Sequence, residues 1–134
     1  MTDVFVGRLM SSPVVTVSPE TAITTAASRL LDRDISSVVV TDADNELVGI
    51  LTTTDFVRMI ADETAAAETS VADYMTTGVV TVGANDSVEA VAETMVRRGF
   101  HHLPVVDDES GVVGMVTTTD VTAYVSHTES PPAA

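Results

Sequence analysis

The chain has 134 residues, 45% of them hydrophobic, and 20 acidic residues against 6 basic ones give it a net charge of −14. This length fits one compact domain or two very small ones, and the charge disfavours binding to nucleic acid or anionic membranes. The sequence contains no cysteine, no basic-plus-apolar leader and no apolar run of about 18 residues, which excludes disulfide and thiol chemistry and predicts a cytoplasmic protein.

Taken in order, the first half predicts a short amphipathic lead, a strand, a helix, two further strands and a second helix. The turn between the later two strands is short, which predicts an antiparallel hairpin. The expected bounds are a lead ending at Met10, a strand over Val14–Val17, a helix from Ser18-Pro19-Glu20 to about Asp34, strands over Ser37–Thr41 and Leu47–Leu51, and a helix from about Thr54 to Ala61.

The second half repeats this order 65 residues later without a gap. Val6 falls on Val71, Met10 on Met75, and Thr52-Thr53-Thr54-Asp55 on Thr117-Thr118-Thr119-Asp120. The corresponding elements are a strand over Val79–Val82, a helix from Asn85-Asp86 to Gly99, strands over His102–Val106 and Val112–Val116, and a helix from about Thr119 to Ser126.

Each copy is therefore a β-α-β-β-α unit of marginal stability alone, because so short a chain buries too little surface, and two copies can bury their sheet faces against each other. This predicts an α+β fold. The expected divisions are a first motif over residues 4–61, a partly helical linker over 62–70, a second motif over 71–126 and a flexible tail over 127–134.

The repeated heptads Gly49–Asp55 and Gly114–Asp120 carry the candidate chemistry. A carboxylate can accept hydrogen bonds from both hydroxyls of a ribose, whereas the alternative is an aspartate that caps the second helix. Threonines spaced by two residues are expected on one side of a strand edge, where they either contact a ligand or serve β-propensity and capping. They are Thr52, Thr54, Thr117 and Thr119.

Three further residues are candidates. Arg58 follows Asp55 by one helical turn and can reach a phosphate, whereas its counterpart in the second copy is Ala123. His101 and His102 open a strand, so their side chains are expected on opposite faces, and structural hydrogen bonding is the alternative role. A metal site is not expected, because the third histidine, His127, is remote and cysteine is absent.

The second copy resembles a known family through Val71–Met75, Val79–Val82, Gly99–Asp107 and Gly114–Asp120. The family is the cystathionine β-synthase (CBS) domain pair, or Bateman module. The first copy resembles it too, although Ser36, Ser37, Val38 and Val39 replace His101, His102, Leu103 and Pro104. Together the copies cover about residues 4–126.

The resemblance implies a pseudo-twofold pair with two clefts between the copies. It implies that these clefts bind AMP, ADP, ATP, S-adenosylmethionine or NAD, and that the module forms a homodimer and regulates an enzyme or transporter. It assigns Asp55 and Asp120 to the ribose, with ligand contacts from Thr52, Thr54, Thr117 and Thr119. It also places His101, His102 and Pro104 at the site, and Thr16 and Thr81 on the opposite walls.

Because only the second copy keeps the histidine pair, we expect a stronger site on that copy and a weaker or empty one on the first. No nucleophile elbow, metal cluster or phosphate-binding glycine loop is present, so the prediction is a non-enzymatic regulatory module. It needs no cofactor, takes an adenine nucleotide as its regulatory ligand, and acts on an unidentified partner protein without nucleic acid or membrane. The alternative is a constitutive dimerisation scaffold that binds no ligand.

The surface charge suggests a further property. All six basic residues are arginine, and the acids are scattered along the chain, which resembles proteins of salt-loving microbes. At molar salt the Debye length falls to about 3 Å, so self-repulsion is screened. An ordinary acidic protein that lacks lysine is the alternative.

Overall fold

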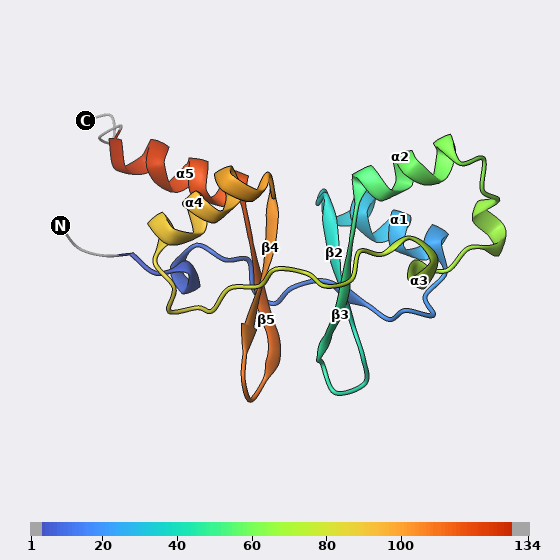
Figure 1. Cartoon of the computed structure of the whole chain (residues 1–134), viewed down its shortest axis with the longest axis horizontal. Helices are drawn as coiled ribbons and strands as arrows, with labels where there is room; N and C mark the ends of the chain where they lie inside the picture. The colour runs from blue at the N-terminus through green and yellow to red at the C-terminus, as the bar shows by residue number, and fades with distance from the viewer. Residues whose placement is uncertain (1–3, 130–134) are drawn as a thin grey trace. The chain divides into compact units, whose positions relative to one another are not determined.

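The computed structural model describes residues 4–129, and it confirms the α+β class (Figure 1). In the first copy the strands and helices follow the predicted order β-α-β-β-α, and the second copy has the same order from its first long helix onward. Their bounds are η1 Val6–Arg8, β1 Thr16–Val17, α1 Ile23–Arg33, β2 Ser37–Thr41, β3 Leu47–Thr52, α2 Thr53–Ala61, η2 Ala66–Glu68, α3 Val71–Tyr74, α4 Val88–Arg98, β4 His102–Asp107, β5 Gly111–Thr117 and α5 Thr118–Glu129.

The two hairpins form as predicted. Strands β2 and β3 pair antiparallel with Ser37 opposite Thr52, and β4 and β5 pair antiparallel with His102 opposite Thr117. The first strand of each copy is much shorter than the predicted four residues. Strand β1 pairs with β2, in parallel, over two residues, and in the second copy the equivalent run makes a single parallel bridge between Val82 and Val105.

The helices α1 and α4 end where predicted but begin later. Asp34 and Gly99 end α1 and α4 in left-handed conformations, with φ of 53° and 69°. The expected starts form turns instead: the Ser18 amide donates to the Thr21 hydroxyl, and the Asp86 carboxylate accepts from the Gly83 amide. Ser87, whose hydroxyl accepts from the Ala90 amide at 3.1 Å, is the cap of α4.

The chain divides into two compact units that do not follow the repeat boundaries. One unit is Val14–Val79, and the other joins Met1–Pro13 to Val80–Ala134. The lead of each repeat therefore packs on the body of the other. The Gly7 amide donates to the Ala84 carbonyl at 2.9 Å, and the Val71 amide donates to the Thr21 carbonyl at 2.9 Å.

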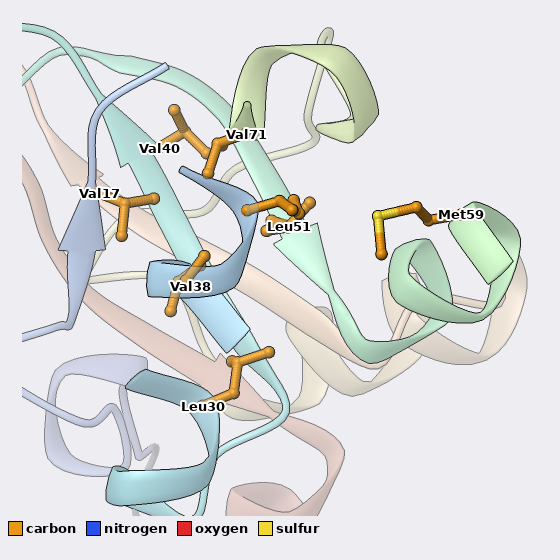
Figure 2. Close-up of a cluster of buried hydrophobic side chains, with 9 residues drawn as sticks. Val17, Leu30, Val38, Val40, Leu51, Met59 and Val71 are labelled. Carbon is orange, nitrogen blue, oxygen red and sulfur yellow. The ribbon is translucent and has the colours of Figure 1, made fainter. Parts of the chain in front are cut away.

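Each unit has its own apolar core, and each core includes a valine from the exchanged lead. Figure 2 shows the core of the Val14–Val79 unit, in which Val71 packs with Val38, Val40 and Leu51. In the other unit Val6 takes the equivalent place beside Val91 and Leu103. Both lead valines are fully buried.

The connecting segments are partly helical. The predicted linker contains the short helix η2, and α5 continues to Glu129 instead of ending near Ser126. The first three residues of the expected flexible tail are therefore helical, and residues 130–134 lie outside the described residues.

Candidate functional site

Each heptad crosses from a strand into a helix, at what we call the first junction (Thr52–Asp55) and the second junction (Thr117–Asp120). The glycines at the heptad starts have a packing role. A Cβ on Gly49 would lie 2.7 Å from the Thr76 carbonyl oxygen, and one on Gly114 would lie 2.9 Å from that of Ser11. The exchanged segments cross the strands at these glycines, so close backbone approach explains both.

The second junction contains a reciprocal capping box. The Asp120 Oδ2 accepts the Thr117 amide at 2.8 Å and the Thr117 hydroxyl at 3.1 Å, while the Thr117 hydroxyl accepts the Asp120 amide at 3.2 Å. The aspartate is therefore the third residue of the helix rather than its cap, which corrects the capping alternative drawn from the sequence. The cap is Thr117.

The first junction has the same pairing of a threonine cap with an aspartate three residues later, but a different charge environment. Asp55 Oδ2 accepts the Thr52 amide at 2.8 Å, and its Oδ1 accepts from Arg58 at 2.7 Å. The Asp55 side chain is 4% exposed and that of Arg58 is 56% exposed. Arg58 therefore forms an ion pair with Asp55 and offsets its negative charge.

Asp120 keeps one oxygen uncommitted. Its hydrogen bonds within the described residues all go to Oδ2 and the backbone amide, and the Arg58 position is occupied by Ala123. Asp120 is half-buried, so Oδ1 remains accessible. The two junctions thus differ in whether a carboxylate oxygen is available to a ligand.

The threonines do not alternate along a strand as the sequence suggested. Thr52 and Thr117 end their strands and cap the helices, whereas Thr54 and Thr119 lie exposed in the first helical turns. The chain enters the helix directly after the cap, so a two-residue strand period does not apply there.

The histidine pair lies at the second junction. The His101 carbonyl accepts the Thr118 amide at 3.0 Å, and half-buried His102 pairs in register with Thr117. Burial, reinforced by the neighbouring charge of His101, lowers the pKa of His102 below 6.5. In the first copy Ser36 makes the equivalent contact, its carbonyl accepting the Thr53 amide at 3.1 Å.

The other predicted site residues are Pro104, Thr81 and Thr16. Pro104 is fully buried in β4, and its carbonyl accepts the Val82 amide at 3.0 Å. Thr81 is half-buried next to that bridge. Thr16 lies in β1, where its carbonyl accepts from Arg29 at 3.0 Å, and it lines a cleft that contains neither Thr52 nor Asp55.

Sequence reasoning missed that cleft. It brings together Ser18–Thr21, Arg29 and Thr41–Ala43 with Thr16. The only signal was the difference between repeats, because Arg29 and Thr41 correspond to Thr94 and Val106.

Within residues 4–129, no three acidic or histidine side chains are grouped so as to hold a metal ion. No helix in that same range has the length and apolar character needed to cross a bilayer.

Comparisons with known proteins identify the family. The CBS domain model matches twice, at residues 6–62 and 71–127, and the chain belongs to the CBS domain family. The fold is that of a CBS domain pair. The CBS pair of protein MJ0100, solved with 5′-methylthioadenosine and S-adenosyl-L-methionine, superposes with a TM-score of 0.88 at 28% identity over 96% of this chain and 100% of that one.

Two other proteins are also similar to this chain. The CBS-domain protein ATU1752 from Agrobacterium tumefaciens is 35% identical, with a TM-score of 0.79 over 90% of this chain and 98% of its own. Homoserine O-acetyltransferase from Methanococcus vannielii is 29% identical over 94% of this chain. The chain spans 26% of that enzyme's length, so the match does not extend to the whole enzyme.

Proposed function

We propose that this CBS pair is a regulatory module that binds an adenosine-containing ligand at its strand–helix junctions. The family and the likeness to the MJ0100 pair, which holds two adenosine compounds, support the ligand class. The observation that carries the proposal is the free Oδ1 of Asp120, held in place by a capping box that uses only the other oxygen.

The second junction provides complementary chemistry for a nucleoside. A ribose diol has two hydroxyl donors, and a hydrogen bond to a carboxylate is worth about 1.5–3 kcal/mol. The exposed His101 imidazole can donate to a phosphate, and the Thr119 hydroxyl lies exposed in the same helical turn as Asp120.

The first junction is the weaker site in this proposal. A ribose there must displace Arg58 from Asp55 or share the carboxylate with it, and Ser36 and Ser37 replace the histidines. We therefore expect one dominant binding event per chain, centred on Asp120.

The regulatory part of the proposal is that ligand binding shifts the population of conformations and a partner protein reads the shift. A homodimer forms part of it, because equivalent apolar side chains are exposed on both repeats. Leu31 and Val96 are 83% and 86% exposed, and Ile60 and Val125 are also exposed. A second copy would cover these helices.

A ligand-free scaffold is the second candidate. Both aspartates already complete helix starts, so each junction is a finished local structure without a ligand. The same exposed apolar helices then serve assembly alone.

A thermal-shift panel separates the two candidates. Wild-type protein is heated with ATP, ADP, AMP, S-adenosylmethionine, 5′-methylthioadenosine or NAD, at low salt and in concentrated KCl. A ligand at 100 times its dissociation constant stabilises by about 2.7 kcal/mol, which is readily detected. No shift with any compound at either salt supports the scaffold.

Isothermal titration of any active compound then tests the unequal sites. D120N keeps an acceptor for the capping box but loses the charge, so it should abolish the dominant event, and D55N is its matched control. R58A, which gives the first copy the alanine of the second, should strengthen binding at the first junction. Equal loss in D55N and D120N would contradict the assignment.

A further inference from the structure

The unit Val14–Val79 contains an open cleft of about 590 Å³. It lies where the parallel strands β1 and β2 end, beside α1. Small-molecule sites have volumes of about 300–1,000 Å³, and parallel strands present ligands at their carboxyl ends. Size and position therefore suit a small molecule.

This cleft is separate from the first junction. Ser37, opposite Thr52, begins β2, whereas Thr41 ends it. Four residue steps along β2 separate the two positions by about 13 Å at roughly 3.3 Å per step. No residue of Thr52–Asp55 lines the cleft.

A largely buried threonine with an unpartnered hydroxyl lines this cleft. Thr41 is 8% exposed, and its hydroxyl makes no hydrogen bond with any residue in the described part of the chain. No fully buried side-chain polar atom among those residues lacks a partner, so the Thr41 hydroxyl reaches solvent. A hydroxyl has one donor and two acceptor sites, so a bound molecule would replace solvent as the partner of Thr41.

Charges of both signs line the cleft. Arg29 donates through one guanidinium nitrogen to the Thr16 carbonyl at 3.0 Å, which orients the group and leaves other N–H donors unused. Asp42 Oδ1 accepts hydrogen bonds from the amides of Asp44 and Glu46, at 2.9 Å each, which leaves Oδ2 available. Glu20 adds a second carboxylate.

This mixture selects the ligand class. A simple anion would meet two carboxylates, and a simple cation would meet the guanidinium. A molecule that carries both charges is matched, because its carboxylate can pair with Arg29 and its ammonium with Asp42 or Glu20. Val17, Pro19 and Ala43 offer apolar surface to a side chain.

We propose that this cleft binds a free α-amino acid. The site belongs to the first repeat alone, since the positions 65 residues after Ser18, Thr21, Arg29 and Thr41 hold Gly83, Asp86, Thr94 and Val106. It is independent of the adenosine site, so the two can be tested separately.

The test uses the full chain, isotope-labelled, with L-methionine as the probe and amide chemical shifts as the readout. N-acetyl-L-methionine lacks the ammonium and L-methionine methyl ester lacks the carboxylate. L-methionine should shift amides of residues 16–21 and 41–43 in the millimolar range, and both blocked compounds should bind about tenfold more weakly or not at all.

Variants complete the design. R29T, which introduces the residue of the second repeat, should weaken L-methionine binding about tenfold or more, and T41V should weaken it less. R33T, on the same helix outside the cleft, should leave binding unchanged, as should D120N. The proposal is overturned if L-methionine causes no shift, if a blocked compound binds equally well, if R33T matches R29T, or if the shifts map to Thr117–Asp120.

Discussion

Replacing Gly49 by alanine tests how tightly the exchanged segment is held over the sheet. The new Cβ would lie 2.7 Å from the Thr76 carbonyl oxygen, whereas ordinary contacts begin at 3.4 Å. The Thr76 backbone must therefore move by about 0.7 Å. It is held to Ile50 by reciprocal hydrogen bonds of 3.0 and 2.9 Å.

The cost follows from those two bonds. A displacement of about 0.7 Å stretches them beyond normal hydrogen-bond lengths. Each contributes about 0.5–1.5 kcal/mol, so G49A should lose about 1–3 kcal/mol, in the range found for overpacked sites. This corresponds to a lowering of the melting temperature by several degrees.

The measurement is urea unfolding followed by circular dichroism, with G83A as the matched control. A Cβ on Gly83 meets only Asp86 oxygens at 3.9 Å, an ordinary contact, so G83A should be close to neutral. Equal stability of G49A and wild type would refute the claim that close backbone approach is the reason for glycine in the heptad.

Three further predictions concern the leads, the histidine pair and the charge. V6A should lower the free energy of unfolding by about 1.5–3 kcal/mol and reduce amide-exchange protection in the second repeat. V71A should have the same effects in the first repeat. Loss of protection in the variant's own repeat would contradict the exchange of leads. Burial and His101 lower the pKa of His102 in the folded protein, so the unfolded chain binds protons more readily. Stability should therefore fall as the pH drops from about 6.5 to the pKa of folded His102. The urea midpoint of H102N should be less sensitive to acid than that of the wild type. With a net charge of −14, the melting temperature should rise between dilute and molar KCl, and no rise would count against adaptation to high salt.

Local sequence patterns predicted the parts of the fold that depend on near neighbours. The β2 bounds, both hairpins and the helix ends at Asp34 and Gly99 were correct, because apolar runs, short turns and left-handed caps are local features. The starts of α1 and α4 were wrong, since Ser18 and Asp86 satisfy turns of their own before these helices begin.

The exchange of leads was beyond sequence reasoning for a physical reason. Val6 and Val71 are equivalent by the repeat, so each pattern fits either body equally well. Periodicity shows which residues seek burial but does not distinguish between two similar partners. The cleft was missed for a related reason, because Thr16, Arg29 and Thr41 meet only through the parallel pairing of β1 with β2.

The duplicated heptad explains how one backbone frame can hold two different sites. Both junctions use a threonine cap and an aspartate three residues later, so the position of the carboxylate is set by the helix start itself. Whether that carboxylate is available to a ligand depends on the residue one helical turn later, which is Arg58 in one copy and Ala123 in the other. A substitution there changes the charge presented to a ligand without altering the frame, which is why R58A is the variant that tests whether the two junctions differ only in electrostatics.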